Sequence, residues 1–322
     1  MSKRRLGKTS IEITAIGMGC WQFARGGNAI GRFWNALSDA QIREIVEAAR
    51  AAGIGWFDTA EIYGKGSSER NLSGALASLQ VAPGSVVIAT KWWPFARTAR
   101  SIGATIDTRL ACLGGYPIDL HQVHQPFSLS SVPAQMKAMA ALVKAGKIKS
   151  VGVSNFSARA MEQAHAVLAA EGIPLASNQV RFSLLDRRIE SNGILAAAKK
   201  LGITIIAYSP LAQGVLTGRF HQDPTASAKL SSMRRMMSPA RASVLERTRP
   251  LVDEIAAIAR AHGVSSSTIA LAWAVGFHGD TVVAIPGASR PAQAQDNAAA
   301  MTVTLTPLEL SRLDELSRPA GR

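Results

Sequence analysis

The feature of this sequence that most constrains its fold is a repeated alternation between short apolar runs and longer amphipathic segments. Eight runs of strand length occur between residues 16 and 285, and each is followed by a segment whose apolar residues recur at helical spacing. The runs cover residues 16–19, 55–58, 86–91, 119–124, 151–155, 176–179, 204–208 and 282–285. Alternating strands and helices indicate a parallel sheet covered by helices. Eight such units in 322 residues favour a (β/α)8 TIM barrel over an open sheet.

Segments before and after the alternation extend this expected barrel. Residues 4–16 predict an N-terminal β-hairpin, because Ile11 and Ile13 alternate with polar neighbours and residues 7–10 can form the turn. Helices are expected over residues 250–262, 266–277, 291–300 and 307–318, the last of them extra C-terminal helices. No linker or shift in composition divides the chain, so we expect residues 1–322 to form a single domain.

One polar and basic insertion interrupts the alternation after the seventh run, over roughly residues 209–247. The part from residue 219 to residue 247 either shapes a ligand pocket, closes over a bound ligand or forms a surface loop. The sequence leaves these alternatives open.

The composition limits the classes of partner. The net charge is +14, but the basic residues are spread along the chain without a nucleic-acid motif, so we expect no nucleic acid and a surface that favours small anions. The chain has neither a run of about 18 apolar residues nor a secretory signal, so we expect no membrane partner. Its two cysteines lack metal-ligand spacing, which predicts no metal site and a reducing, cytoplasmic location.

Two glycine motifs that suggest phosphate binding are incomplete. Gly7 and Lys8 begin a P-loop-like group, but the glycine that this motif needs five residues earlier is a serine. Gly17 and Gly19 begin a dinucleotide-binding pattern whose third position is Gln22. Neither motif therefore predicts a phosphate site by itself.

Polar and aromatic residues gather at the ends of the predicted strands. In a (β/α)8 barrel the active site lies at the C-terminal ends of the strands. The residues at these ends are Trp21, Asp58, Lys91, His124, Ser154, Asn155, Gln179, Tyr208 and Gly287. Each alone has an ordinary structural explanation, such as a helix cap or a solvated charge. Together at one rim they indicate a functional site.

Four of the residues near this rim predict proton transfer: Asp58, Tyr63, Lys91 and His124. A free phenol titrates near 10, and we expect the Lys91 ammonium to lower the pKa of Tyr63. Asp58 would hold Lys91 charged and in place. Tyr63 would then give a proton to a carbonyl oxygen that receives a hydride at carbon, while His124 hydrogen-bonds the same oxygen.

The chain resembles the aldo-keto reductases from about residue 4 to residue 318. The resemblance rests on FDTAEIYG at residues 57–64, GKIKSVGVSNF at 146–156 and YSPLAQGVLTG at 208–218. The catalytic Asp, Tyr, Lys and His of the family fall on the four residues just named. The resemblance therefore implies reduction of aldehydes or ketones, or a cofactor-binding regulatory subunit such as the potassium-channel β-subunits. No partner-binding extension precedes the hairpin, so we favour the enzyme.

The resemblance also implies a nicotinamide cofactor that lies extended across the rim. The residues that would contact it are Trp21, Ser154, Asn155, Gln179, Tyr208, Ser209, Leu211, Gln213, Gly214, Leu216, Gly287, Ser289, Arg290, Gln293 and Asn297. Of these, Ser154, Asn155 and Gln179 would hold the carboxamide, and Tyr208 would stack on the nicotinamide ring.

The expected cofactor is NADPH rather than NADH. Arg290 and Ser289 can bind a 2′-phosphate. Gln293 stands where some branches of the family carry an arginine, which weakens this preference. The partner would be a small carbonyl compound in an aromatic pocket formed by Trp21, Trp92, Trp93 and His124. The sequence does not indicate an oligomeric state.

Overall fold

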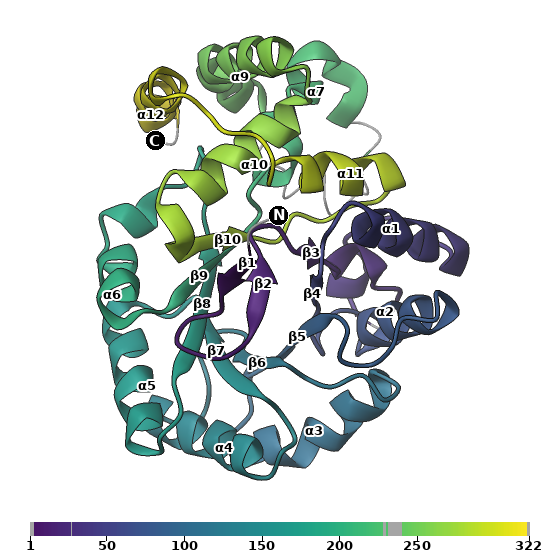
Figure 1. The fold of residues 1–322 in the computed structure, drawn as a ribbon, viewed down its shortest axis with the longest axis vertical. Coiled ribbons are helices and arrows are strands. Elements are labelled where there is room, and N and C mark those ends of the chain that lie inside the picture. The colour runs from purple at the N-terminus through teal and green to yellow at the C-terminus, as the bar shows by residue number, and fades with distance from the viewer. Residues whose placement is uncertain (1–2, 27, 228–229, 231–239, 321–322) are drawn as a thin grey trace.

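A closed parallel barrel forms the centre of the molecule (Figure 1). The computed structural model describes residues 3–26, 28–227, 230 and 240–320. The strands are β3 (Met18–Gly19), β4 (Trp56–Asp58), β5 (Val87–Trp92), β6 (Leu120–Val123), β7 (Ser150–Ser154), β8 (Leu175–Arg181), β9 (Thr204–Tyr208) and β10 (Val282–Ala284). Each pairs with the next along the chain, and parallel bridges from Ile16 to Ala284 and from Gly19 to Gly287 close the sheet. The expected (β/α)8 TIM barrel is confirmed.

Helices surround the barrel, as Figure 1 shows. They are α1 (Asp39–Ala51), α2 (Ser67–Ser78), α3 (Arg100–Cys112), α4 (Val132–Lys144), α5 (Ala158–Ala170), α6 (Ile194–Leu201), α10 (Ser266–Gly276) and α11 (Pro291–Ala299). Helix α1 illustrates how the sequence sets these elements. Ser38 and Gln41 form a capping box, and Ile42, Ile45 and Val46 are buried on one face.

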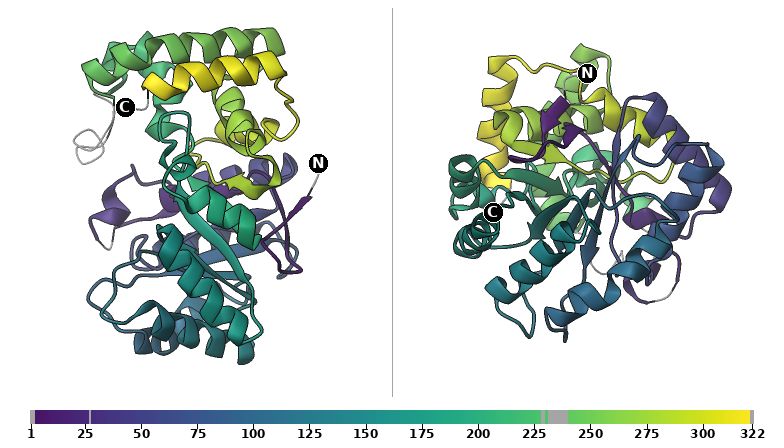
Figure 2. Two further views of the ribbon diagram at one scale, coloured as in Figure 1. Left: turned by 90° about the vertical axis from the view of Figure 1, so that its left-hand side faces the viewer. Right: turned by 60° about the horizontal axis from the view of Figure 1, so that its bottom comes forward.

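The predicted N-terminal hairpin is present as β1 (Lys3–Arg5) and β2 (Glu12–Thr14). Its apolar residues Leu6 and Ile13 join a buried cluster with Trp56 and Leu120, the first residues of β4 and β6. The hairpin therefore covers the N-terminal end of the barrel, as Figure 2 also shows. The hairpin does not cover the C-terminal ends of the strands, where the active site of a (β/α)8 barrel lies.

The insertion after β9 contains more regular structure than the sequence predicts. It forms η4 (Ala212–Thr217), α7 (Arg219–Gln222) and η5 (Pro224–Ser227), while residues 228–229 and 231–239 lie outside the described part of the chain. Helix α9 (Ala242–His262) begins well before Pro250, so the start expected at residue 250 is wrong. A proline is favourable at a helix start, but here buried Thr248 and Leu251 hold both sides of Pro250 in one helix.

The last helix, α12 (Pro307–Ala320), packs beside α9 outside the barrel, in agreement with the expected extra C-terminal helices (Figures 1 and 2). The remaining short helices are η1 (Trp21–Phe23), η2 (Ile30–Arg32), η3 (Arg188–Glu190) and η6 (Gly279–Thr281). None of the helices in the described ranges has both the length and the apolar character needed to cross a membrane.

Candidate active site

Asp58 and Lys91 form a buried ion pair at the ends of adjacent strands. Asp58 ends β4, Lys91 precedes the last residue of β5, and their side chains are 2% and 0% exposed. The Lys91 Nζ also donates a hydrogen bond of 2.9 Å to the main-chain oxygen of Thr59. Because a charge in the interior must be paired and hydrogen-bonded, Asp58 both neutralises the ammonium and fixes its position.

The second carboxylate oxygen of Asp58 accepts hydrogen bonds from two amides. Gln122 Nε2 lies at 3.1 Å and Gln179 Nε2 at 2.9 Å from Asp58 Oδ2. Gln122 is not among the site residues predicted from the sequence. The signal was available, because Gln122 lies two residues before His124, and side chains two apart in a strand share a face. These amides complete a buried polar layer beneath the rim.

Tyr63 lies beside this ion pair, with its ring centroid 5.2 Å from Lys91 Nζ. Burial raises the pKa of the Tyr63 phenol above 10.0, and the attraction of Lys91 opposes this rise without cancelling it. Lys91 lowers this pKa as expected, but the cost of burying a phenolate is larger, so the pKa of Tyr63 is raised on balance. Burial would lower the pKa of Lys91, but Asp58 and Tyr63 outweigh it and the pKa is raised.

His124 lies next to Tyr63 with its imidazole almost fully buried. The two rings meet edge to face with centroids 5.6 Å apart. Burial, and then the charge of Lys91, hold the pKa of His124 well below 6.5. The imidazole is therefore neutral at neutral pH, with one donor and one acceptor nitrogen.

The three tryptophans expected in the substrate pocket do not share one environment. Trp21 stacks on Tyr63 at 5.7 Å between centroids, and Trp93 meets His124 edge to face at 5.2 Å. Trp92, by contrast, is 1% exposed, and its indole donates to Ser101 in α3 at 3.0 Å. The placement of Trp92 in the pocket is wrong, because β5 continues through Trp92 and directs successive side chains to opposite faces.

The residues expected to hold a nicotinamide carboxamide lie together at the ends of β7, β8 and β9. Ser154 Oγ donates to the main-chain oxygen of Gln179 at 2.9 Å, and Asn155 Nδ2 donates to Ser154 Oγ at 3.1 Å. The hydroxyl of Tyr208 donates to Asn155 Oδ1 at 3.0 Å. Three elements thus bring these four side chains into one polar group beside the ion pair of Asp58.

The segment after β9 has a strained backbone. Of the seven non-glycine residues with positive φ in the described ranges, four lie at the expected cofactor segments: Asn155, Ser209, Ala212 and Gln213. Strain of this kind is found where a binding site requires it. Gly214 follows with φ of 99°, whereas Leu216 is fully buried in the core, so its side chain does not line the rim. Leu211 is partly buried and precedes η4.

Arg219, like Gln122, is not among the site residues predicted from the sequence. Its Nε and Nη2 atoms are buried without a hydrogen-bond partner, and its guanidinium lies 4.3 Å from the centroid of the Phe220 ring. Burial and then the charge of Arg290 lower the pKa of Arg219. Two neighbouring arginines, one with unpaired buried donors, form a site suited to an anion.

The segment after β10 has the close packing expected of a binding turn. A Cβ added at Gly287 would lie 2.0 Å from the Gln22 amide, so a larger residue there would displace the Gln22 side chain. The Ser289 main-chain nitrogen and Oγ both donate to Gln293 Oε1, at 2.9 and 3.0 Å. Asn297 is buried and its amide donates to the main-chain oxygen of Gly287 at 3.5 Å.

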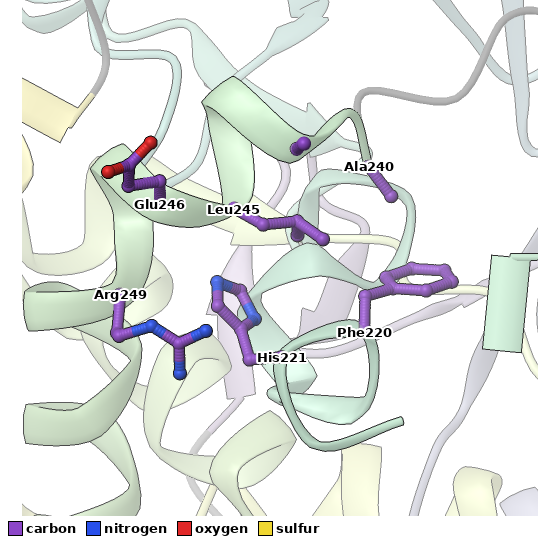
Figure 3. Close-up of a pocket in the computed structure, with 7 residues that line it drawn as sticks. Phe220, His221, Ala240, Leu245, Glu246 and Arg249 are labelled. Carbon is purple, nitrogen blue, oxygen red and sulfur yellow. The ribbon is translucent and has the colours of Figure 1, made fainter. Parts of the chain in front are cut away.

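A separate pocket of about 510 Å³ lies between α7 and α9 (Figure 3). Its lining residues are Phe220, His221, Ala240, Ala242, Leu245, Glu246 and Arg249. Its lining does not include Tyr63 or the residues around it. We assign it no role.

Similarity to known proteins agrees with this geometry. A model of the Aldo/keto reductase family matches residues 15–318. The chain belongs to the aldo/keto reductase family. An uncharacterized oxidoreductase of Mycobacterium tuberculosis is 34% identical over 308 residues, which cover 95% of this chain and 90% of that protein. The resemblance inferred from the three motifs is confirmed.

Two solved aldo-keto reductases have the same fold. A thermostable aldo-keto reductase in complex with the inhibitor epalrestat matches with a TM-score of 0.75 and 28% identity, covering 98% of this chain and 100% of that one. An aldo-keto reductase from Klebsiella pneumoniae in complex with NADPH matches with a TM-score of 0.75 and 25% identity, covering 100% and 98%. This aldo/keto reductase is therefore an oxidoreductase of a family that uses nicotinamide cofactors.

Proposed function

We propose that this aldo/keto reductase is an NADPH-dependent enzyme that reduces aldehydes or ketones to alcohols, with Tyr63 as the general acid. The observation that carries the proposal is the buried pair of Asp58 and Lys91 beside the Tyr63 phenol. A buried ammonium held by a carboxylate stabilises a phenolate that has just given up its proton. The neutral imidazole of His124 completes a site for a carbonyl oxygen.

Each side chain then has one task in the reaction. The bound nicotinamide would supply a hydride to the carbonyl carbon. Tyr63 gives its proton to the carbonyl oxygen, so that the carbonyl becomes an alcohol and the phenol becomes a phenolate. Lys91 stabilises that phenolate, and Asp58 keeps Lys91 charged. His124 hydrogen-bonds and orients the carbonyl oxygen without taking up a proton, since its pKa lies well below neutrality.

The residues present suit a nicotinamide dinucleotide. The polar group of Ser154, Asn155 and Gln179 would hold the carboxamide, and the Tyr208 ring would face the nicotinamide. The strained turn that includes Ser209, Leu211, Gln213 and Gly214 would follow the pyrophosphate. The unpartnered buried nitrogens of Arg219 support an anion there.

A preference for NADPH over NADH rests on charge at the far end of this path. Arg290 directly precedes α11 and lies near Arg219, and its planar guanidinium matches the geometry of a phosphate. Ser289 and Gln293 hydrogen-bond to each other beside it and would meet the adenosine end. Both cysteines are free and buried, which fits the reducing cytoplasm that we also propose.

Transfer of deuterium tests this function. NADPH that carries deuterium at nicotinamide C4 would be incubated with the protein and a panel of reactive aldehydes and ketones. We expect deuterium at the alcohol carbon of the product when the label stands on one face of the nicotinamide ring, and no deuterium there when it stands on the other face. If the protein binds NADPH but reduces none of the carbonyl compounds, the result contradicts a reductase and favours a cofactor-binding regulatory role.

A further inference from the structure

A continuous chain of aromatic rings leads from Tyr63 to the protein surface. His124 meets Trp93 at 5.2 Å between centroids, Trp93 meets Phe127 at 5.9 Å, and Phe127 meets Phe95 at 6.2 Å. All three contacts are edge to face, with interplanar angles from 86° to 87°. The first ring of this chain belongs to the proposed catalytic group, and the last lies in solvent.

The outer end of this chain is an exposed apolar patch formed by Phe95, Phe127 and Leu129. These side chains are 66%, 47% and 71% exposed, and among the described residues only Leu308 is a further large apolar side chain of this kind. Leu308 lies on α12, across the barrel from α3 and α4 in Figure 1. The exposed apolar surface is thus concentrated where the loops after β5 and β6 meet, and such a patch marks a binding site.

Partly buried polar contacts hold the two loops of the patch in one arrangement. The Glu61 carboxylate accepts hydrogen bonds from the main-chain nitrogen of Trp93 and from the Arg97 guanidinium. The main-chain oxygen of Arg97, in the loop after β5, accepts hydrogen bonds from Ser128 Oγ at 2.9 Å and from the Leu129 nitrogen at 3.0 Å, both in the loop after β6. The patch is therefore preorganised before any ligand arrives.

We propose that Phe127 and Phe95 are specificity-determining residues that bind the distal apolar part of an extended substrate. This inference rests on the proposed reductase function. A substrate with a single ring, whose carbonyl group lies near Tyr63 and His124, would extend only as far as Trp93. A second ring, or an alkyl chain of similar length, reaches Phe127 one centroid step of 5.9 Å farther out. The favoured substrates are thus aldehydes or ketones with two rings or a long apolar chain.

A pair of aldehydes that differ by one ring tests this inference. For the Phe127→Ala variant we expect an increase of about tenfold in KM for biphenyl-4-carbaldehyde with kcat unchanged, since part of one ring loses its apolar contact. The KM for benzaldehyde stays within about twofold, because its ring ends before Phe127. Phe95→Ala acts in the same direction on a longer substrate, 4-benzyloxybenzaldehyde. Leu308→Ala, the matched exposed control, changes neither KM.

Three outcomes would overturn the inference. Equal changes for both aldehydes would mean that Phe127 acts only through the shape of the site. An unchanged KM for both aldehydes would mean that Phe127 does not contact the substrate. The third outcome is a native dimer, measured by sedimentation, that dissociates in the Phe95→Ser variant while the KM for biphenyl-4-carbaldehyde stays unchanged. This result would assign the patch to contact with a second copy of the chain.

Binding measurements separate this inference from the proposed function. If the native protein reduces neither aldehyde, the reductase function fails, and titration of tryptophan fluorescence with the two aldehydes still tests the patch. We then expect tighter binding of biphenyl-4-carbaldehyde than of benzaldehyde, and loss of that difference in Phe127→Ala. An unchanged difference would contradict the role of Phe127.

Discussion

The ammonium nitrogen of Lys91 lies 5.2 Å from the centroid of the Tyr63 ring, while its ion pair is made with Asp58. Lys91 has no exposed side-chain surface, so its charge is stable there only because Asp58 is present. The carboxylate and the phenol therefore compete for one cation. A change at Asp58 should alter both stability and the titration of Tyr63.

The Asp58→Asn variant tests this coupling. The substitution leaves a buried ammonium without a counter-charge, so we expect the free energy of unfolding to fall by on the order of 3 kcal/mol. We also expect the reduction rate to fall at least about tenfold because Lys91 is no longer held charged. Chemical denaturation and steady-state kinetics measure the two effects. Glu12→Gln, which breaks an exposed pair with Lys3, is the control and should change neither quantity.

The pH dependence of reduction follows from the two shifted groups. Tyr63 must be protonated to give up a proton, and burial raises its pKa above 10.0, so activity should be lost only as the pH rises above about 10. His124 has a pKa well below 6.5 and should add no inflection near that value. The profile of kcat/KM from pH 5 to pH 10.5 measures both. An inflection between pH 6 and pH 7 that disappears in His124→Gln would contradict a neutral imidazole.

The positions of Asp58, Lys91 and His124 could be predicted from sequence because each lies at the C-terminal end of a strand in a regular repeat. In a closed barrel these ends must lie at one rim, so spacing along the chain is enough. The face of a side chain at a strand boundary is harder to predict. β5 extends one residue beyond Lys91, and the side chain of that residue, Trp92, is buried in the core.

Other features depend on burial and on distant contacts. The pKa of Tyr63 is set by how much protein surrounds the phenol, which the neighbouring charges in the sequence do not reveal. Arg219 lies in a segment outside the strand–helix repeat, and its proximity to Arg290, which follows much later in the chain, is not visible in the sequence. The start of α9 before Pro250 likewise depends on packing that outweighs a local signal.

Two arginine variants separate the parts of the cofactor site. Arg290→Ala should raise the Kd for NADPH about tenfold with little change for NADH, because only NADPH has a 2′-phosphate. Arg219 lies beside the turn at Gly214, so Arg219→Ala should weaken both cofactors by a similar factor. Fluorescence titration with each cofactor measures these constants. An equal rise in the Kd for NADPH and for NADH in Arg290→Ala would contradict a contact between Arg290 and the 2′-phosphate.

Stability against acid should depend on His121. This imidazole is 1% exposed, and burial lowers its pKa from 6.5 to about 4. The unfolded chain binds a proton below pH 6.5 that the folded chain does not, so stability present above pH 6.5 is lost as the pH falls towards 4. The titration of His121 alone lowers the free energy of unfolding by about 3 kcal/mol at most. Denaturation from pH 4 to pH 7.5 should show a shallower decline in His121→Gln, and an unchanged decline would contradict the assignment.

The most direct test of the central claim is the rate of hydride transfer in Tyr63→Phe, measured in a single turnover with bound NADPH and a reactive aromatic aldehyde. This substitution removes the phenolic proton and preserves the ring that stacks on Trp21. We predict a fall of about a thousandfold in this rate with the Kd for NADPH unchanged. An equal rate in the native protein and the variant would contradict Tyr63 as the proton donor.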